Sequence, residues 1–285
     1  MSERARRAIA TFAVATLVSA ACVLLGLWQW HRYVARSAAV AVVQANYDAA
    51  PVPIGQGVGG DATVSAPEEW HPVAATGHYL PHATVLLRNR PVNGTSGYHV
   101  LAPFLVQDGA LAGTVVLVDR GFLPATGDAA RVPSVPQPPT GQVDLVARLR
   151  VAEQPTERQA PAGQVQAIDV AAARSTAAQP WSGPAVHGYA QAVTEDGAPP
   201  AGLGSLALPS TDLGPHLSYA FQWWVFASGA LVGAVVLIRR EGSASGPRRP
   251  PRRRHPTAEQ EEDALLDAQE AAMRRATSTP RRDLP

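Results

Sequence analysis

The sequence predicts a membrane protein in which two transmembrane α-helices flank a mostly antiparallel β domain, built as a sheet or an open barrel with one short helix. The helices are predicted from residues 8–27 and 219–238, two apolar stretches of 20 residues each. The first contains no charged residue, and the second contains one side-chain amide, Gln222. The β domain is predicted from the region between them, where short apolar runs alternate with segments rich in proline and glycine.

The first stretch predicts a transmembrane helix over residues 8–30, after a cytoplasmic N-terminus of residues 1–7. A hydrocarbon core of about 30 Å needs about 20 helical residues to cross it. The apolar core is longer than the roughly 7 to 15 residues of a cleaved signal peptide, and its exit, WQWHRY, lacks a small-residue cleavage site. We therefore expect this helix to be retained.

Between the helices, residues 31–214 are expected to form an extracytoplasmic, β-rich domain. Residues 143–151 nearly alternate between apolar and polar side chains, which indicates a half-buried strand. Residues 114–119 form a short apolar run that suits a fully buried strand, and residues 84–90 resemble it. A short helix is predicted over residues 169–178, where Asp169 would cap the first turn and Pro180 would stop the helix.

The second apolar stretch predicts a transmembrane helix over residues 215–238. Its Gly229 and Gly233 form a G-x-x-x-G pair, which permits close approach of another helix. We expect this pair to pack the two helices together, or to dock a partner, rather than to bind a cofactor.

The cytoplasmic tail, residues 239–285, begins with a segment rich in glycine, proline and arginine. Residues 257–275 have acidic side chains first and basic ones last, which suits a helix macrodipole. The alternative, favoured by composition, is a disordered tail whose arginines lie near anionic lipid.

Arginine placement predicts the orientation in the bilayer. Arg4, Arg6 and Arg7 precede the first helix, and Arg239 and Arg240 follow the second. By the positive-inside rule both termini are cytoplasmic, and a multi-pass protein of a bacterial plasma membrane is the expected location.

Composition excludes several functions. All 24 basic residues are arginine, so Schiff-base chemistry and P-loop phosphate binding are excluded, and the single Cys22 cannot form an internal disulfide or a cysteine-based metal cluster. A net charge of +1 predicts no binding to nucleic acid. No common nucleophile or zinc motif is present, so we do not expect an enzyme.

The entry to the second helix holds the candidate ligand site. His216, Tyr219 and Trp223 have the i, i+3, i+7 spacing of one helix face. An imidazole above aromatic rings suits a flat macrocycle, with His216 ligating a haem iron. The alternative is an interfacial histidine hydrated by water, with both aromatic residues anchoring the helix at the membrane surface.

The exit of the first helix is expected at the same interface, because the two helices run in opposite directions. It carries Trp28, Gln29 and Arg32. The Arg32 guanidinium suits a carboxylate such as a haem propionate, or equally a lipid phosphate, and Gln29 is placed to bridge the helices. In the β domain, Arg90 and Arg120 each end an apolar strand, where structural ion pairs are expected.

Four segments give the chain its resemblance to a known family. They are LGLWQWHR, the stretch from VAATGHYL through LLRNRPVNGTSGYHVLAPF, VVLVDRGFLP, and HLSYAFQWWVFA. In order and topology they resemble the Surfeit locus protein 1 family of cytochrome c oxidase assembly factors. Two places differ from the family pattern: Gly214 and Pro215 stand where asparagines are frequent, and Asp119-Arg120 where asparagine-arginine is usual.

This resemblance implies a factor that helps to insert haem A into oxidase subunit I, in contact with that subunit and with the haem A synthesis and insertion machinery. The position matching the family's candidate haem ligand is His216. Two alternatives stay open: a haem-free scaffold that stabilises an oxidase assembly intermediate, and an extracytoplasmic enzyme with an unrecognised site.

Overall fold

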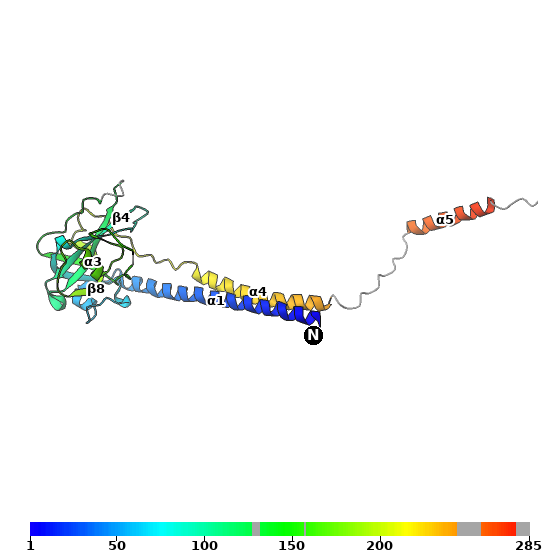
Figure 1. Cartoon of the computed structure of the whole chain (residues 1–285), viewed down its shortest axis with the longest axis horizontal. Coiled ribbons are helices and arrows are strands. Elements are labelled where there is room, and N and C mark those ends of the chain that lie inside the picture. Colours follow the sequence, from blue (N-terminus) through cyan, green and yellow to red (C-terminus); the bar gives the residue numbers. More distant parts are fainter. Residues whose placement is uncertain (127–131, 157, 244–257, 278–285) are drawn as a thin grey trace, which may run out of the picture. The chain divides into compact units, whose positions relative to one another are not determined.

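The computed structural model describes residues 1–126, 132–156, 158–243 and 258–277. The chain divides into two compact units (Figure 1), one made of Met1–Ala21 with Phe226–Pro285 and the other of Cys22–Val225. Each unit therefore contains part of both long helices, and the second also contains the β domain.

Helix α1, Glu3–Asn46, contains the predicted transmembrane span of residues 8–30 and continues beyond it into the region that was expected to be β-rich. No proline or glycine occurs from residue 31 to residue 50, and this stretch is rich in alanine, a strong helix former. Val40 and Val43 are buried, so packing also supports the extension. At 1.5 Å per residue the 44 residues extend about 66 Å, roughly twice a hydrocarbon core.

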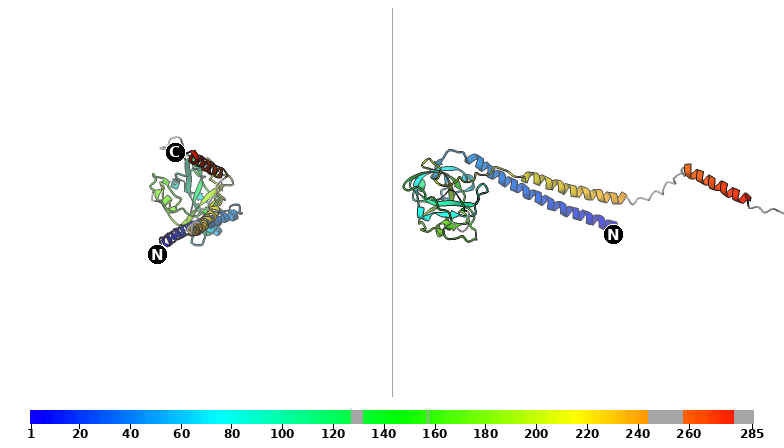
Figure 2. Two further views of the ribbon diagram at one scale, coloured as in Figure 1. Left: turned by 90° about the vertical axis from the view of Figure 1, so that its right-hand side faces the viewer. Right: turned by 90° about the horizontal axis from the view of Figure 1, so that it is seen from above.

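Helix α4, His216–Ser243, begins one residue later and ends five residues later than predicted. The carbonyl of Pro215 accepts the first bond, from the Tyr219 N–H at 3.1 Å. Helices α1 and α4 run side by side in Figure 1 and in the right-hand view of Figure 2. Both are long and apolar enough to cross a membrane, and only 11% of the most apolar window of each is buried within the protein. That exposure distinguishes them from the core helices of a soluble domain.

Small buried residues line the contact between the two helices. In the unit that contains the β domain, Cys22 and Ala220 are buried, and the other unit buries Ala15, Ala227 and Ala234. The spacing of seven residues on α4 is that of a helix-packing seam.

Of the two roles expected for the G-x-x-x-G pair, close packing of the two helices was wrong, and docking of a partner stays a prediction. A Cβ atom added at Gly229 or Gly233 would meet nothing within 4 Å, because both lie on an exposed face beside the seam. They line an open apolar groove of about 550 Å³ together with residues of the first half of α1, such as Val14 and Val18.

The β domain contains eight strands among the described residues. The elements between the long helices are β1 (Val52–Pro53), α2 (Ile54–Gly57), η1 (Ala66–Glu68), β2 (Pro72–Tyr79), η2 (Pro81–Ala83), β3 (Val85–Leu87), β4 (Gly97–Val106), η3 (Gly109–Leu111), β5 (Val115–Pro124), β6 (Val143–Arg150), β7 (Gln164–Val165), α3 (Val170–Thr176) and β8 (Ala185–Glu195). All three predicted strand regions are strands β6, β5 and β3, and the predicted helix is α3, which Asp169 caps by accepting the Ala172 N–H at 2.8 Å.

Five strands form a closed ring in the order β2–β6–β8–β5–β4–β2. The prediction of a sheet or an open barrel needs one correction. The ring is closed rather than open, because β2 pairs with β6 along most of its length and with β4 at its end. Gly77 makes this closure possible: a Cβ atom there would overlap the Leu105 carbonyl and lie 2.7 Å from the Phe104 ring.

Most strand pairings are antiparallel, as predicted, but the sheet is partly parallel. Strands β5 and β8 are adjacent and parallel, as are β1 with β2 and β3 with β7. The crossover from β5 to β8 contains β6, β7 and α3, which is long enough for a parallel connection. Apolar periodicity shows only which residues are buried, so it does not predict whether two neighbouring strands are parallel or antiparallel.

Three apolar clusters fill the described part of the domain. The first includes Val73, Phe104 and Leu149 inside the ring. The second includes Leu101 and Trp181 on the outer face of the ring, where α3 and β7 cover it. The third, which is smaller, includes Tyr98 and Val100.

The end of α1 is fixed to the β domain. The Asn46 side-chain amide donates to the carbonyls of Pro67 and Glu69 at 2.8 and 2.9 Å. The Arg148 guanidinium lies 3.8 Å from the centre of the Tyr47 ring, and its Nε donates to the Tyr47 carbonyl at 3.0 Å. The C-terminal end of α1 is thus held against the β domain by hydrogen bonds and a ring contact.

In the tail, helix α5 spans Ala258–Thr277, where composition favoured disorder. Its acidic first half and basic end complement the helix macrodipole, which compositional averaging ignores. The remainder of the predicted tail, residues 244–257 and 278–285, lies outside the described residues.

Candidate functional site

His216 and Gln29 meet where α4 begins, and they form the centre of the candidate site. The His216 Nδ1 lies 2.9 Å from the Gln29 Oε1. A carbonyl oxygen only accepts hydrogen bonds, so Nδ1 carries the hydrogen, and Nε2 keeps its lone pair. This is the arrangement by which proteins fix a histidine for binding iron or another metal through Nε2.

Close packing beside this pair depends on Gly26. A Cβ atom added there would overlap the indole of Trp224, lying 2.6 Å from its Cδ1. The Trp224 ring in turn lies 6.2 Å from that of Trp30 and 5.5 Å from that of Phe221, the latter edge to face. Tryptophan thus lies against bare α1 backbone, which brings the first turns of α4 close enough for His216 to reach Gln29.

The other predicted site residues lie on the same turns of α1 and α4 as this pair, or on nearby ones. Tyr219 is 47% exposed, and Trp223, on the same helix face, is half-buried. On α1, Trp28 is 54% exposed and the Arg32 guanidinium carbon lies 5.3 Å from the centre of its ring. The Arg32 guanidinium thus lies over the Trp28 ring, and Gln29 is the predicted site residue whose hydrogen bond to His216 the structure shows.

Arg36 is a site residue that the sequence analysis missed. Its Nε donates to the Asp212 carbonyl at 2.8 Å, and its Nη2 donates to the Ser210 carbonyl at 2.7 Å. These bonds hold the segment before α4 against α1 and so fix the approach to His216. Backbone carbonyl partners have no sequence signature, and only their shared position in space reveals the contact.

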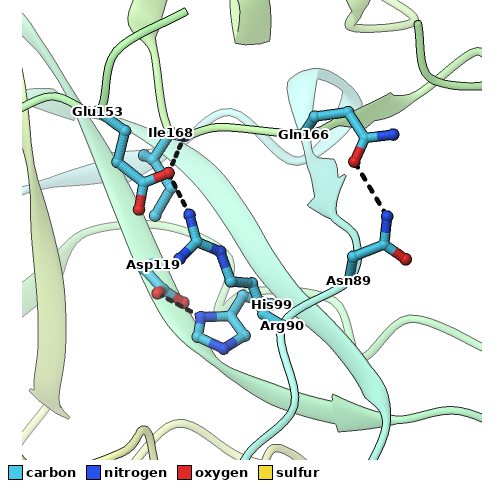
Figure 3. A network of polar contacts seen from close by, with 7 residues as sticks. All are labelled: Asn89, Arg90, His99, Asp119, Glu153, Gln166 and Ile168. Atoms are coloured by element: carbon cyan, nitrogen blue, oxygen red, sulfur yellow. Dashed lines mark hydrogen bonds and ion pairs between the residues drawn. The ribbon is translucent and has the colours of Figure 1, made fainter. Parts of the chain in front are cut away.

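A second polar cluster lies in the wall of the β domain (Figure 3). The Asp119 side chain is completely buried, its Oδ2 lies 2.8 Å from His99 Nδ1, and its Oδ1 has no described partner. Burial raises the pKa of the Asp119 carboxyl, and the hydrogen bond from His99 opposes part of that rise. Arg90 pairs with Glu153 in the same cluster, as expected for a structural ion pair.

A third cluster is inside the ring, where Arg120 forms the predicted ion pair. Its Nε and Nη2 donate to the two carboxylate oxygens of Glu195 at 2.7 and 2.8 Å. The Tyr79 hydroxyl also donates to Glu195, at 2.7 Å, and burial followed by the Glu195 charge raises the pKa of that hydroxyl. All three side chains are satisfied by one another, so this cluster is structural.

No group of three or more potential metal ligands from histidine, cysteine, aspartate and glutamate occurs within the described parts of the chain. A site held by one imidazole, as at His216, is a different arrangement that this criterion does not address.

Comparison with known proteins assigns the family. The sequence model of the SURF1 family matches residues 16–228. The chain belongs to the SURF1 family. The match includes the β domain and both sides of the His216–Gln29 contact, so the SURF1 assignment covers the whole candidate site.

Relatives of this SURF1 protein include uncharacterised SURF1-like proteins of Mycobacterium bovis and Mycobacterium tuberculosis. Each is 33% identical over 236 residues, which cover 79% of this chain and 82% of the relative. The cytochrome oxidase assembly protein SHY1 of Saccharomyces cerevisiae is 29% identical over 101 residues, covering 35% of this chain and 24% of the yeast protein.

Proposed function

We propose that this SURF1 protein is a bacterial membrane-anchored assembly factor for cytochrome oxidase. Family membership and the yeast relative, which is named for cytochrome oxidase assembly, support the role. Two largely exposed apolar helices support anchoring in a lipid bilayer, with arginines next to the chain ends on the cytoplasmic side.

We further propose that the protein holds haem A at the outer mouth of α1 and α4 and passes it to oxidase subunit I. The observation that carries this proposal is the His216–Gln29 hydrogen bond, which leaves Nε2 of a half-buried imidazole as a fixed electron-pair donor. When bound, haem A would supply its own redox chemistry, and the protein would do no bond-making.

The residues around His216 fit such a group. Tyr219 and Trp28 offer exposed aromatic surface to a flat apolar macrocycle, and the Arg32 guanidinium offers a planar fork for a carboxylate. Gln29 would act as a positioning residue through the imidazole, and Arg36 would hold the loop that leads to it.

The test is to purify the full chain after co-expression with haem A synthesis and to record its haem absorption. Wild type should show a Soret band, and His216→Ala should lose it. Gln29→Ala should weaken haem binding about 10- to 100-fold, the usual cost of losing the partner of a ligand histidine. His31→Ala is the matched control, because His31 is an exposed histidine on the neighbouring α1 turn and should leave the band unchanged.

A haem-free scaffold is the second candidate, and the apolar groove beside Gly229 and Gly233 favours it, since such a groove admits a helix of an assembly intermediate. A wild-type protein without a Soret band, combined with oxidase deficiency in its absence, would support the scaffold. Equal loss of haem in His31→Ala and His216→Ala would contradict the assigned ligand.

A further inference from the structure

A separate pocket in the β domain is not used by the proposed haem site. It has a volume of about 210 Å³ and lies where β3 ends and β4 begins. Its lining includes the side chains of Arg88, Arg90, Asn89, Ser96 and Tyr98. Among the described residues no carboxylate lines it.

Arg88 is the unusual member of this lining. Its side chain makes no hydrogen bond or ion pair to any residue in the described ranges, and its Nε is buried without a hydrogen-bond partner. Leaving a donor of a charged group unsatisfied is costly, and native proteins rarely do so without a reason. The structure therefore retains a positive charge in a pocket that does not neutralise it.

The second arginine adds to this charge. Arg90 pairs with Glu153, toward which it points in Figure 3. Two guanidinium groups and one carboxylate leave an excess of one positive charge beside the pocket. The hydroxyl-bearing Ser96 and Tyr98 supply further hydrogen-bonding capacity in the lining.

Asn89 sets the local geometry between the two arginines. Its φ of 59° is in the left-handed region, which asparagine tolerates better than most residues. Its side-chain amide donates to the Gln166 Oε1 at 3.0 Å, on the opposite side of the view from Arg90 in Figure 3. The backbone conformation at Asn89 is thus held by Gln166, which does not line the pocket, and the neighbouring Arg88 and Arg90 both contribute to the lining.

We propose that this pocket binds a small oxyanion, a phosphate or carboxylate group, with Arg88 as its principal partner. A guanidinium group presents paired N–H donors that match two oxygens of either group. The ligand is therefore anionic and compact, and it binds through a site independent of His216.

The test is thermal unfolding of the purified full chain, followed by tryptophan fluorescence, during titration with sodium phosphate or sodium acetate at fixed pH and ionic strength. At least one anion should raise the midpoint of wild type saturably. Arg88→Gln should weaken its binding at least tenfold. Arg158→Gln, which removes an exposed arginine of the same domain that does not line the pocket, should leave binding unchanged.

The two titrations distinguish the source of the oxyanion, since phosphate alone indicates a phosphate ligand and acetate alone a carboxylate. If Arg88→Gln does not fold, Arg88→Lys takes its place: it keeps the charge but loses the fork, and binding should still weaken several-fold. The proposal is overturned if neither anion gives a saturable shift in wild type, or if the folded Arg88 variant binds as wild type does.

Discussion

At the scale of single residues, the β domain depends on charged groups placed where water cannot reach them. Asp119 and Arg120 are adjacent in β5, and their side chains point to opposite faces of the ring. One bonds to His99 on the neighbouring strand, and the other to Glu195 inside the ring. Removing one partner of a buried pair leaves the other uncompensated, which is why such pairs tolerate substitution poorly.

Asp119 should make stability depend on pH. Because burial raises its pKa above the ordinary 3.8, the folded protein holds the proton more tightly than the unfolded chain does. The stabilisation that the protonated Asp119 adds to the folded state is therefore complete below about pH 3.8. It is lost as pH rises through the raised pKa, and the free energy of unfolding then falls by up to about 1.4 kcal/mol per pH unit. His99 and Arg150 face this carboxyl and oppose the effect.

The measurement is the free energy of unfolding of wild type and of Asp119→Asn between pH 4 and pH 8 in denaturant. The wild-type value minus the variant value should fall as pH rises. A difference that stays constant, or that grows with pH, would contradict the assignment of a raised pKa to Asp119.

Sequence reasoning identified Arg90 and Arg120 as ends of apolar strands and correctly expected ion pairs. It did not identify Glu153 or Glu195 as the partners, which are 63 and 75 residues away in the chain. Those partners depend on the pairing order of the strands, and pairing order is a property of the folded sheet that no local pattern contains.

At the scale of elements, the contact between α1 and α4 depends on one missing side chain. Gly26→Ala should separate the two helices locally, because the new methyl group would overlap the Trp224 ring. We expect weakened haem binding and altered tryptophan fluorescence, with a loss of stability of about 1–3 kcal/mol, the usual cost of overpacking.

Gly229→Ala is the matched control for this change. It places the same methyl group on α4 where nothing lies within 4 Å, so haem binding and fluorescence should match wild type. If both variants behaved alike, the glycine at position 26 would not be required for close packing.

Both long helices were predictable from hydropathy, and α3 was predictable from its capping Asp169 and the following Pro180. Apolar runs identified the regions of β3, β5 and β6, but the other strands, such as β2, β4 and β8, were not singled out. The extension of α1 to Asn46 was missed because hydropathy marks where a membrane ends and not where a helix ends. The closed ring was missed because its key residue, Gly77, carries no hydrophobic signal.

At the scale of the whole molecule, the antiparallel course of the two long helices brings their ends together. Two successive membrane spans with a domain between them must run in opposite directions, and this argument from the sequence correctly predicted that Gln29 lies near His216. The contact of Arg32 with Trp28 was not predictable, since a flexible side chain has several partners within reach.

The proposed membrane orientation has a direct test. Alkaline phosphatase fused after residue 106, at the end of β4, should be active in bacteria, whereas fusions after residue 243 should be inactive, with the reverse pattern for a cytoplasmic fluorescent reporter. Active phosphatase after residue 243 would refute the placement of the C-terminus in the cytoplasm, and inactive phosphatase after residue 106 would remove the proposed outer location of His216.

The uninterrupted course of α1 from Gln29 to its attachment at Asn46 fixes the rotation of the β domain relative to the proposed haem site. Each residue of a helix advances about 100° and 1.5 Å. Deleting one residue between these points would swing the oxyanion pocket through more than a quarter of a turn about the helix axis, whereas deleting seven would restore its bearing at a shorter distance. The number of residues in this stretch therefore determines both the rotation and the distance between the two sites, and length differences among related proteins should correspond to whole helical turns.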